Sequence, residues 1–364
     1  MNKRHFTTTV IASTFLAALA NMHSAHAFEF SANLKTVETQ TALLLPAVQQ
    51  AASEAPRIEG LELLKKIGEY SQELTRYQAA KPTESDIPIL RHIGEHMAKI
   101  SETRLALDKP QRLGETRIAF RSPEDPSASF EIDQSVGNFL FNSGLNKFRK
   151  PENTPNLPWQ NDLAPLAREH FTEFDLPINP RELEIEHVGG LNMAIADGSG
   201  ASEIFEKIKT IRFKRNINGL PVEGDSRIIA HFGENSTLTG LVFQWPTIGS
   251  KQAISSKELN SPETMRAVAQ KQLEEVSQEA LSAKLTEVEL VLYDDGKGNM
   301  EPAYHIVLER QLDLGEREST MIPFDFYLPV SQKPVAEIPR VKDAVLAAAD
   351  GSNTERYESR AANE

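Results

Sequence analysis

The sequence predicts an α+β protein, with an N-terminal helical region followed by tandem modules that each pair one helix with an antiparallel sheet. Three observations support this fold class. Apolar residues recur at helical spacing up to residue 108, and alternating apolar and polar residues begin near Gly114. After residue 151, a helix pattern followed by several strand patterns occurs twice, so the repeat lies in the pattern and not in residue identity.

These patterns divide the chain into six expected segments. They are a signal peptide (1–27), a helical region (28–113), a small antiparallel sheet region (114–150), a first module (151–250), a second module (260–335) and an acidic, largely disordered tail (336–364).

The first 27 residues have the three parts of a secretory signal peptide. Lys3 and Arg4 give a positive start, a largely apolar stretch covers 9–20, and Ala25-His26-Ala27 supplies the small residues of a cleavage site. The apolar stretch is shorter than the roughly 20 residues that span a bilayer, which argues against a membrane anchor. We expect a bacterial periplasmic or secreted protein, cleaved near Ala27, with no transmembrane segment in the mature chain.

The composition limits the possible partners. The chain of 364 residues has no cysteine and a formal net charge of −13. The absence of cysteine excludes disulfides, so the fold must depend on its core. A strong negative charge repels the phosphates of nucleic acids, and we expect no nucleic-acid partner, whereas a basic or neutral protein is compatible with this charge.

The spacing of apolar residues marks the helical region and the sheet region that follows it. Apolar stripes at helical spacing cover 58–74 and, after a break at Pro82-Thr83-Glu84-Ser85, 87–100. We expect amphipathic helices there, packed on each other or on the following sheet. The strands expected next cover 116–120, 127–133 and 138–141, and a connector rich in Pro and Asn covers 150–159.

Each module begins with a helix start signal. Asp162 is the expected N-cap of a helix through Phe174, while Ser261 caps a second helix with Pro262 as its first residue, running to about Ala283. The strands expected after these helices cover 183–187, 191–196, 210–217, 227–232 and 238–245 in the first module, and 287–293, 303–312 and 321–328 in the second.

The segment between the modules, 246–261, is polar, and we expect no strand to continue through it. Each module alone offers few strands and a small core. This favours one sheet shared by both copies over two autonomous domains.

The most specific motif is Asn218-Gly219-Leu220-Pro221-Val222-Glu223-Gly224, an Asn-Gly turn, a proline and a second glycine between two apolar runs. Together with the strands expected at 211–217, 228–232 and 238–242, it resembles the PepSY and FTP modules, the latter found ahead of thermolysin-like and fungalysin peptidases. The segment 302–309 resembles the central strand of the same family.

The resemblance implies a helix on a small antiparallel sheet that binds or restrains another protein or assists its folding, with no catalytic residues. No His-Glu-x-x-His peptidase motif follows in this chain. We therefore expect a non-enzymatic binding protein whose partner is a separate exported protein, such as a peptidase, and we assign no catalytic, cofactor-binding or metal-binding residues. A structural envelope protein is a further alternative.

An enzymatic alternative rests on His92-Ile93-Gly94-Glu95-His96, the inverted order of a zinc-peptidase motif. On a helix, His92 and His96 would share one face, and a zinc-dependent hydrolase would take a third ligand such as Glu169 or Glu173. Chance occurrence and a helix-weakening glycine favour a solvated helix edge instead.

Two other features have ordinary structural explanations. Asp294-Asp295-Gly296-Lys297-Gly298-Asn299 lacks the closing acidic residue of a calcium loop and is expected to be a hairpin turn. Pro323 and Pro329 mark an edge strand, and an exposed edge is one way to capture another chain.

Overall fold

The computed structural model describes residues 57–70, 73–144, 155–197, 200–278, 280–313 and 319–339. The expected signal peptide and residues 340–364 of the expected tail lie outside the described residues. Among the described residues, no helix is both long enough and apolar enough to cross a membrane.

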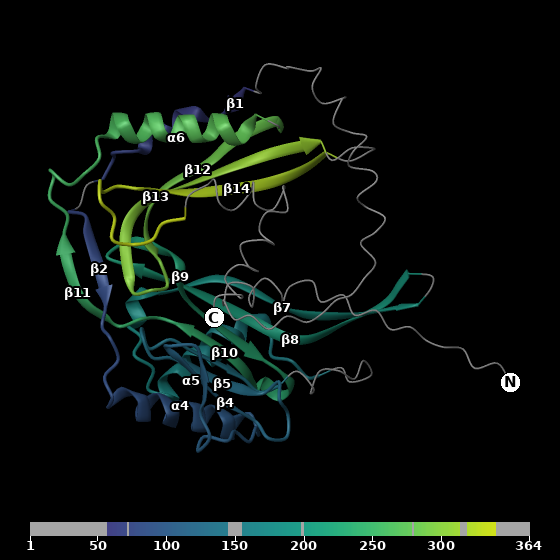
Figure 1. The fold of residues 1–364 in the computed structure, drawn as a ribbon. Helices are drawn as coiled ribbons and strands as arrows, with labels where there is room; N and C mark the ends of the chain where they lie inside the picture. The colour runs from purple at the N-terminus through teal and green to yellow at the C-terminus, as the bar shows by residue number, and fades with distance from the viewer. Residues whose placement is uncertain are drawn as a thin grey trace, which may run out of the picture.

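The described residues fold mainly into strands of one mixed, 14-stranded sheet (Figure 1). The strands are β1 Ile58–Glu59, β2 Thr75–Ala79, β3 Gln111–Leu113, β4 Arg117–Arg121, β5 Ser129–Asp133, β6 Phe139–Asn142, β7 Leu183–Asp197, β8 Gly200–Ile217, β9 Leu220–Phe232, β10 Leu238–Gln244, β11 Ile248–Ala253, β12 Ala280–Asp294, β13 Asn299–Asp313 and β14 Ser319–Pro329. The helices are η1 Leu61–Lys66, α4 Asp86–Ile100, η3 Gln160–Asp162, α5 Leu163–Glu173, η4 Pro180–Glu182, η5 Glu234–Ser236 and α6 Pro262–Ser277.

The expected fold class, α+β with an N-terminal helical region and tandem helix-plus-sheet modules, is therefore wrong. The order across the sheet is β11-β2-β13-β12-β9-β10-β6-β5-β4-β3. Strands from the N-terminal region and from both expected modules are thus neighbours, because backbone pairing between segments far apart in sequence joins them.

The N-terminal region departs most from expectation. In its described part, α4 is the one α-helix, and it buries the expected stripe through Leu90, Ile93 and Met97. The described residues of the stripe over 58–74 instead form β1, the 3₁₀ helix η1 and the residues that lead into β2. The 3₁₀ helix is preceded by Gly60, which has φ 80° and lies so close to the backbone of β12 that no Cβ would fit.

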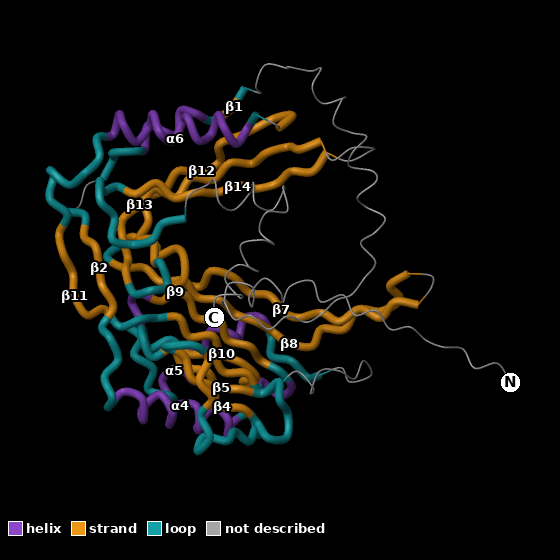
Figure 2. Tube along the Cα trace, in the orientation of Figure 1, coloured by secondary structure: helices purple, strands orange, loops and turns teal. Residues whose placement is uncertain are grey.

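The sheet carries two separate hydrophobic cores, seen as two lobes in Figure 1. The first lobe comprises β3–β10 with α4 and α5, and its core is rich in aromatic side chains such as Phe130, Phe213 and Phe243. Trp245 is also fully buried there. Figure 2 shows its helices lying outside the strands.

The second lobe comprises β1, η1, α6 and β12–β14. The Ser261 side chain accepts a hydrogen bond from the Thr264 amide at 3.1 Å, and Pro262 is the first residue of α6, so both signals are confirmed. The helix ends at Ser277 and not near Ala283, because β12 begins at Ala280 and pairs with β13.

The lobes meet at a short parallel pairing of β9 with β12, in which Val222, Glu223 and Gly224 lie opposite Leu292, Tyr293 and Asp294. A third apolar cluster joins the two cores at this point, formed by Tyr77, Ile217, Val222, Leu292 and Met300. The expectation that no strand occupies 246–261 is wrong, since β11 pairs with β2 there. The expected sharing of one sheet is confirmed.

Candidate functional site

The Asn218–Gly224 motif shapes the junction between the lobes. Asn218 and Gly219, both with positive φ, form the turn from β8 to β9. The register then jumps, because Arg215 pairs with Val222 whereas Lys214 pairs with Arg227. Residues 223–226 therefore leave β8 and bulge toward β12. Gly224, with φ 91°, lies against the Asp294 backbone, where only a glycine fits.

This bulge opens a cleft of about 890 Å³ between the lobes. β9 contributes Glu223 and Asp225 to the cleft, and β8 contributes Arg212. Opposite them lie Tyr293 at the end of β12 and Tyr327 on β14. Side chains from β4–β6, including Arg117, Glu131 and Asp133, close the remaining wall.

The second lobe presents an aromatic stack to the cleft. The ring centroids of Tyr293 and Tyr327 lie 4.6 Å apart, and the His305 ring stacks on Tyr327 at 4.7 Å. His305 Nε2 lies 3.2 Å from Asp325 Oδ2. Burial alone would lower the pKa of His305, but the Asp325 carboxylate outweighs it and raises that pKa above its ordinary value.

The cleft is acidic on balance, since five acidic and three basic side chains line it. Arg212 Nε lies 2.5 Å from Glu186, and Lys297 pairs with Glu337, so carboxylates already neutralise these two cations. Within the described part of the chain, the Glu223 carboxylate has no hydrogen bond or close ion pair. The pKa of Glu223 is raised, and burial of its carboxylate is the largest cause.

The tyrosine hydroxyls report the same negative environment. Burial and the nearby Asp225 carboxylate raise the pKa of Tyr293 to about 12, and burial together with Glu223 raises the pKa of Tyr327. A half-buried carboxylate beside aromatic rings and further acids favours a cation, because a positive ligand relieves the repulsion and can lie over a ring face.

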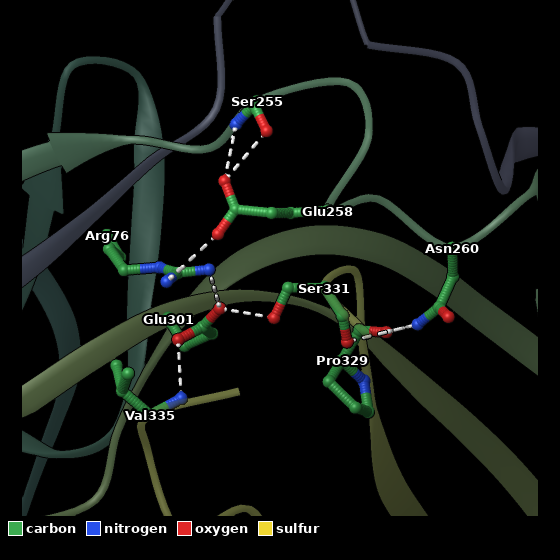
Figure 3. Close-up of polar contacts among 8 residues, drawn as sticks. All are labelled: Arg76, Ser255, Glu258, Asn260, Glu301, Pro329, Ser331 and Val335. Carbon is green, nitrogen blue, oxygen red and sulfur yellow. Dashed lines mark hydrogen bonds and ion pairs between the residues drawn. The ribbon is translucent and has the colours of Figure 1, made fainter. Parts of the chain in front are cut away.

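The segment 331–339, here called the rim segment, reaches the cleft at Pro339, and a buried carboxylate holds the segment in place (Figure 3). Glu301 is fully buried and accepts hydrogen bonds from Ser331 Oγ at 2.6 Å and from the Val335 amide at 2.9 Å. Arg76 on β2 lies between Glu301, at 3.4 Å, and Glu258, at 3.7 Å. The network ties β2, β13 and the rim together.

The His92–His96 motif, which was the enzymatic alternative, lies elsewhere, on α4. His92 pairs with Glu95 at 3.5 Å, and its side chain is 80% exposed. His96 Nε2 instead reaches Glu173 Oε1 at 3.4 Å, and Glu173 also meets His170 Nδ1 at 3.2 Å. No group of three or more His, Asp or Glu side chains in the described part of the chain could hold a metal ion.

The structure also explains the glycine inside this motif. A Cβ at Gly94 would collide with the ring of Phe130, so the glycine allows α4 to lie close to the sheet. Of the two downstream residues considered as third ligands, Glu173 is brought to His96. His170 completes this polar group and was not identified from the sequence.

The turn 294–299 is the hairpin expected from its sequence. The Asp295 side chain accepts hydrogen bonds from the amides of Lys297 and Asn299 at 2.8 Å and 3.0 Å. Its second oxygen accepts from the Asn299 side chain at 2.9 Å. The acidic groups of this turn therefore stabilise the turn itself.

The cleft could not be identified from the sequence in the same way. The motif containing Glu223 was recognised as a turn, but its carboxylate had no distinguishing pattern. The signal that would have pointed to the cleft is the second glycine, Gly224. It has a left-handed conformation three positions before β9 rejoins β8 at Arg227, which indicates a bulge toward another element.

The chain is similar to two solved structures. One is an uncharacterized protein from Eubacterium rectale, at 10% identity and a TM-score of 0.43, which covers 74% of this chain and 86% of that chain. The other is the Bacillus megaterium YpeB C-terminal domain, at 9% identity and a TM-score of 0.32, which covers 70% of this chain and 95% of that chain.

No protein-family model matches the sequence, and no curated protein matches it. TM-scores at this level do not establish a shared fold. The resemblance to PepSY and FTP modules and to peptidase propeptides stays a prediction.

Proposed function

We propose that this chain is an exported, non-enzymatic binding protein that takes a positively charged, extended segment of another exported protein into the cleft between its lobes. The observation that carries the proposal is the half-buried Glu223 carboxylate, without a hydrogen bond or close ion pair among the described residues, beside the Tyr293–Tyr327 pair.

The charge of the whole chain supports the same partner class. A net charge of −13 attracts basic proteins and accelerates their encounter at low ionic strength. The cleft lies open between the two lobes, so it suits an extended chain segment better than a small, enclosed ligand. A peptidase is the partner suggested by the resemblance to PepSY and FTP modules, and its inhibition or assisted folding would follow from binding.

Binding of labelled peptides tests the proposal. Fluorescence anisotropy would compare a serine-rich peptide that carries lysines with the same peptide carrying glutamates, at low and at physiological salt. We expect binding of the lysine peptide only, weakened by salt. Glu223→Gln should weaken it by roughly 3- to 30-fold, the range expected for one charge-assisted contact.

Glu169→Gln is the matched control, since Glu169 is an exposed carboxylate on α5, outside the cleft lining. It should leave binding unchanged. Equal binding of the lysine and glutamate peptides, or equal effects of the two substitutions, would reject the cleft as a site for cations. Export is tested separately by the mass of the periplasmic protein, which should begin at Phe28.

A further inference from the structure

A second hollow lies on the other side of β14 from the cleft. It is a groove of about 770 Å³ between α6 and the rim segment, with the end of β14 as its floor. Its lining is mainly apolar, and it includes Val268 on α6, Leu328 on β14, and Ala336 and Ile338 on the rim. Val268 is 40% exposed although it is aliphatic and faces this groove.

The groove and the cleft share two lining residues, Tyr327 and Pro339, so they are neighbours on the surface. The two hollows differ in character: the cleft is acidic and aromatic, whereas the groove is aliphatic. A ligand that fills both must carry a positive charge at one place and an apolar side chain at another.

The β14 edge restricts how such a ligand can lie. Among the described residues, β14 pairs with β13 alone. The Val330 N–H donates to the Pro302 carbonyl of β13. Because the direction of main-chain hydrogen bonds alternates along an antiparallel strand, the N–H and C=O groups of the odd-numbered residues 321–329 point away from β13. Pro323 and Pro329 occupy two of these outward positions and have no N–H to donate.

A partner strand therefore cannot pair along the whole of β14. Asp325 and Tyr327, between the two prolines, still have an outward N–H and C=O. Only this short stretch of the edge can make main-chain hydrogen bonds, so the edge favours a segment that crosses it over a long added strand.

An unsatisfied polar atom in the groove wall points to the same kind of ligand. Gln272 on α6 lines the groove, and its Oε1 is buried without a hydrogen-bond partner among the described residues. A buried acceptor without a partner is costly. An N–H of an extended segment bound in the groove is a donor that could satisfy it.

We infer that the cleft and the groove form one binding path, in which an extended segment of the partner protein places a basic side chain beside Glu223 and an aliphatic side chain against Val268. This inference rests on the proposed function and adds the kind of sequence that is bound. The segment contains a basic residue and, separated from it by a short spacer on either side, aliphatic residues.

Three sets of fluorescein-labelled peptides test it. The first carries lysine among serines, and the other two add a leucine pair after or before the lysine, with serine spacers of increasing length. In the wild-type protein, one leucine set should bind about tenfold more tightly than the lysine set, because burying a leucine contributes roughly 1.5 kcal/mol or more. Val268→Asp should remove this gain and leave the affinity for the lysine set unchanged, while Glu223→Gln should weaken both.

The matched control is Ile89→Asp, another exposed aliphatic residue near the start of a helix, on α4 of the first lobe. It should change none of the affinities. If the lysine set binds but leucine adds nothing, or if Val268→Asp weakens both sets equally, the single path is overturned and the cleft proposal stands. If no peptide binds the wild-type protein, both fall.

Discussion

Asp294 shows how a single residue can link the junction of the lobes to pH. Its carboxylate is 2% exposed, accepts from Ser226 Oγ at 2.5 Å and from the Gly296 amide at 3.0 Å, and faces Asp225 and Asp295. Burial, the largest cause, raises its pKa to about 6 despite these hydrogen bonds. The folded protein therefore holds the proton more tightly than the unfolded chain does.

This shift predicts the sign of a pH effect on stability. As pH rises from about 4 to about 6, the free energy of unfolding should fall through Asp294 by up to ~3 kcal/mol, because the unfolded chain releases the proton first. In Asp294→Asn this loss is absent, so the free energy of unfolding of the variant should rise relative to that of the wild type over that pH range. Urea denaturation at several pH values would measure the difference.

Asp86→Asn provides a control of opposite sign. Hydrogen bonds from the Thr83 amide and hydroxyl lower the pKa of Asp86, so its contribution is present at neutral pH and is lost as pH falls. The free energy of unfolding of the wild type should therefore rise relative to that of Asp86→Asn as pH rises. A stability difference between wild type and Asp294→Asn that stays constant from pH 4 to pH 7 would contradict the buried-carboxylate argument.

Gly219 and Gly224 were expected to adopt backbone conformations that cost energy for other residues, and their φ values of 84° and 91° confirm this. Their surroundings differ, because a Cβ at Gly219 meets nothing within 4 Å, whereas at Gly224 it meets the Asp294 backbone. Gly219→Val should cost about 1–2 kcal/mol from strain alone. Gly224→Val should cost ~3 kcal/mol or more, since it also separates β9 from β12.

Equal shifts of the urea midpoint for the two variants would mean that the bulge moves away from β12 without cost. The sequence made both glycines visible as turn residues. It could not rank them, because the partner that crowds Gly224 is 70 residues away in the chain.

At the scale of elements, the caps of α5 and α6 provide a matched pair. Ser261 accepts a hydrogen bond from the Thr264 amide, whereas Asp162 has helical backbone angles and makes no side-chain cap bond. Ser261→Ala should therefore lower the free energy of unfolding by about 1 kcal/mol. Asp162→Ala should stay within about 0.5 kcal/mol of the wild type. Thermal or urea unfolding of both variants checks this, and a larger effect at Asp162 would contradict it.

Elements with local signals were the ones that could be predicted. The helices α4, α5 and α6 each follow an apolar stripe or a start signal within their own residues, and the hairpin turns at 218–219 and 294–299 follow from their Asn, Asp and Gly residues. The apolar spacing over 58–74 was compatible with a helix. Here Leu64 and Ile67 are buried under α6 from a 3₁₀ turn, so a tertiary contact decided what the local pattern left open.

Strand β11 was not predicted from the sequence, for a related reason. Its residues, Ile248–Ala253, are polar and mostly exposed, and no alternation marks them as a strand. What holds the strand is its pairing with β2, which lies about 170 residues earlier. The same limit applies to the whole candidate site, since Glu223 and Tyr327 come together only through the β9–β12 and β13–β14 pairings.

At the scale of the whole molecule, the chain crosses between the lobes more than once. Ile58, Leu64, Ile67 and Leu74 belong to the core of the second lobe, although they precede the first lobe in sequence. The parallel pairing of β9 with β12 and the cluster around Tyr77 add further links. A cut between the lobes therefore leaves the second lobe without part of its core.

Lys257 is the position to cut, because it is exposed in a turn, whereas Lys251 lies in β11 opposite Tyr77. With a specific protease site inserted after Lys257, cleavage should leave both fragments in one peak on native size exclusion. Separating them in urea and removing the urea from each alone should leave the C-terminal fragment unfolded, since the core side chains of residues 58–74 remain on the other fragment. Remixing them before the urea is removed should restore the single peak. Two folded fragments that elute apart would mean that each lobe is stable without the strands donated by the other.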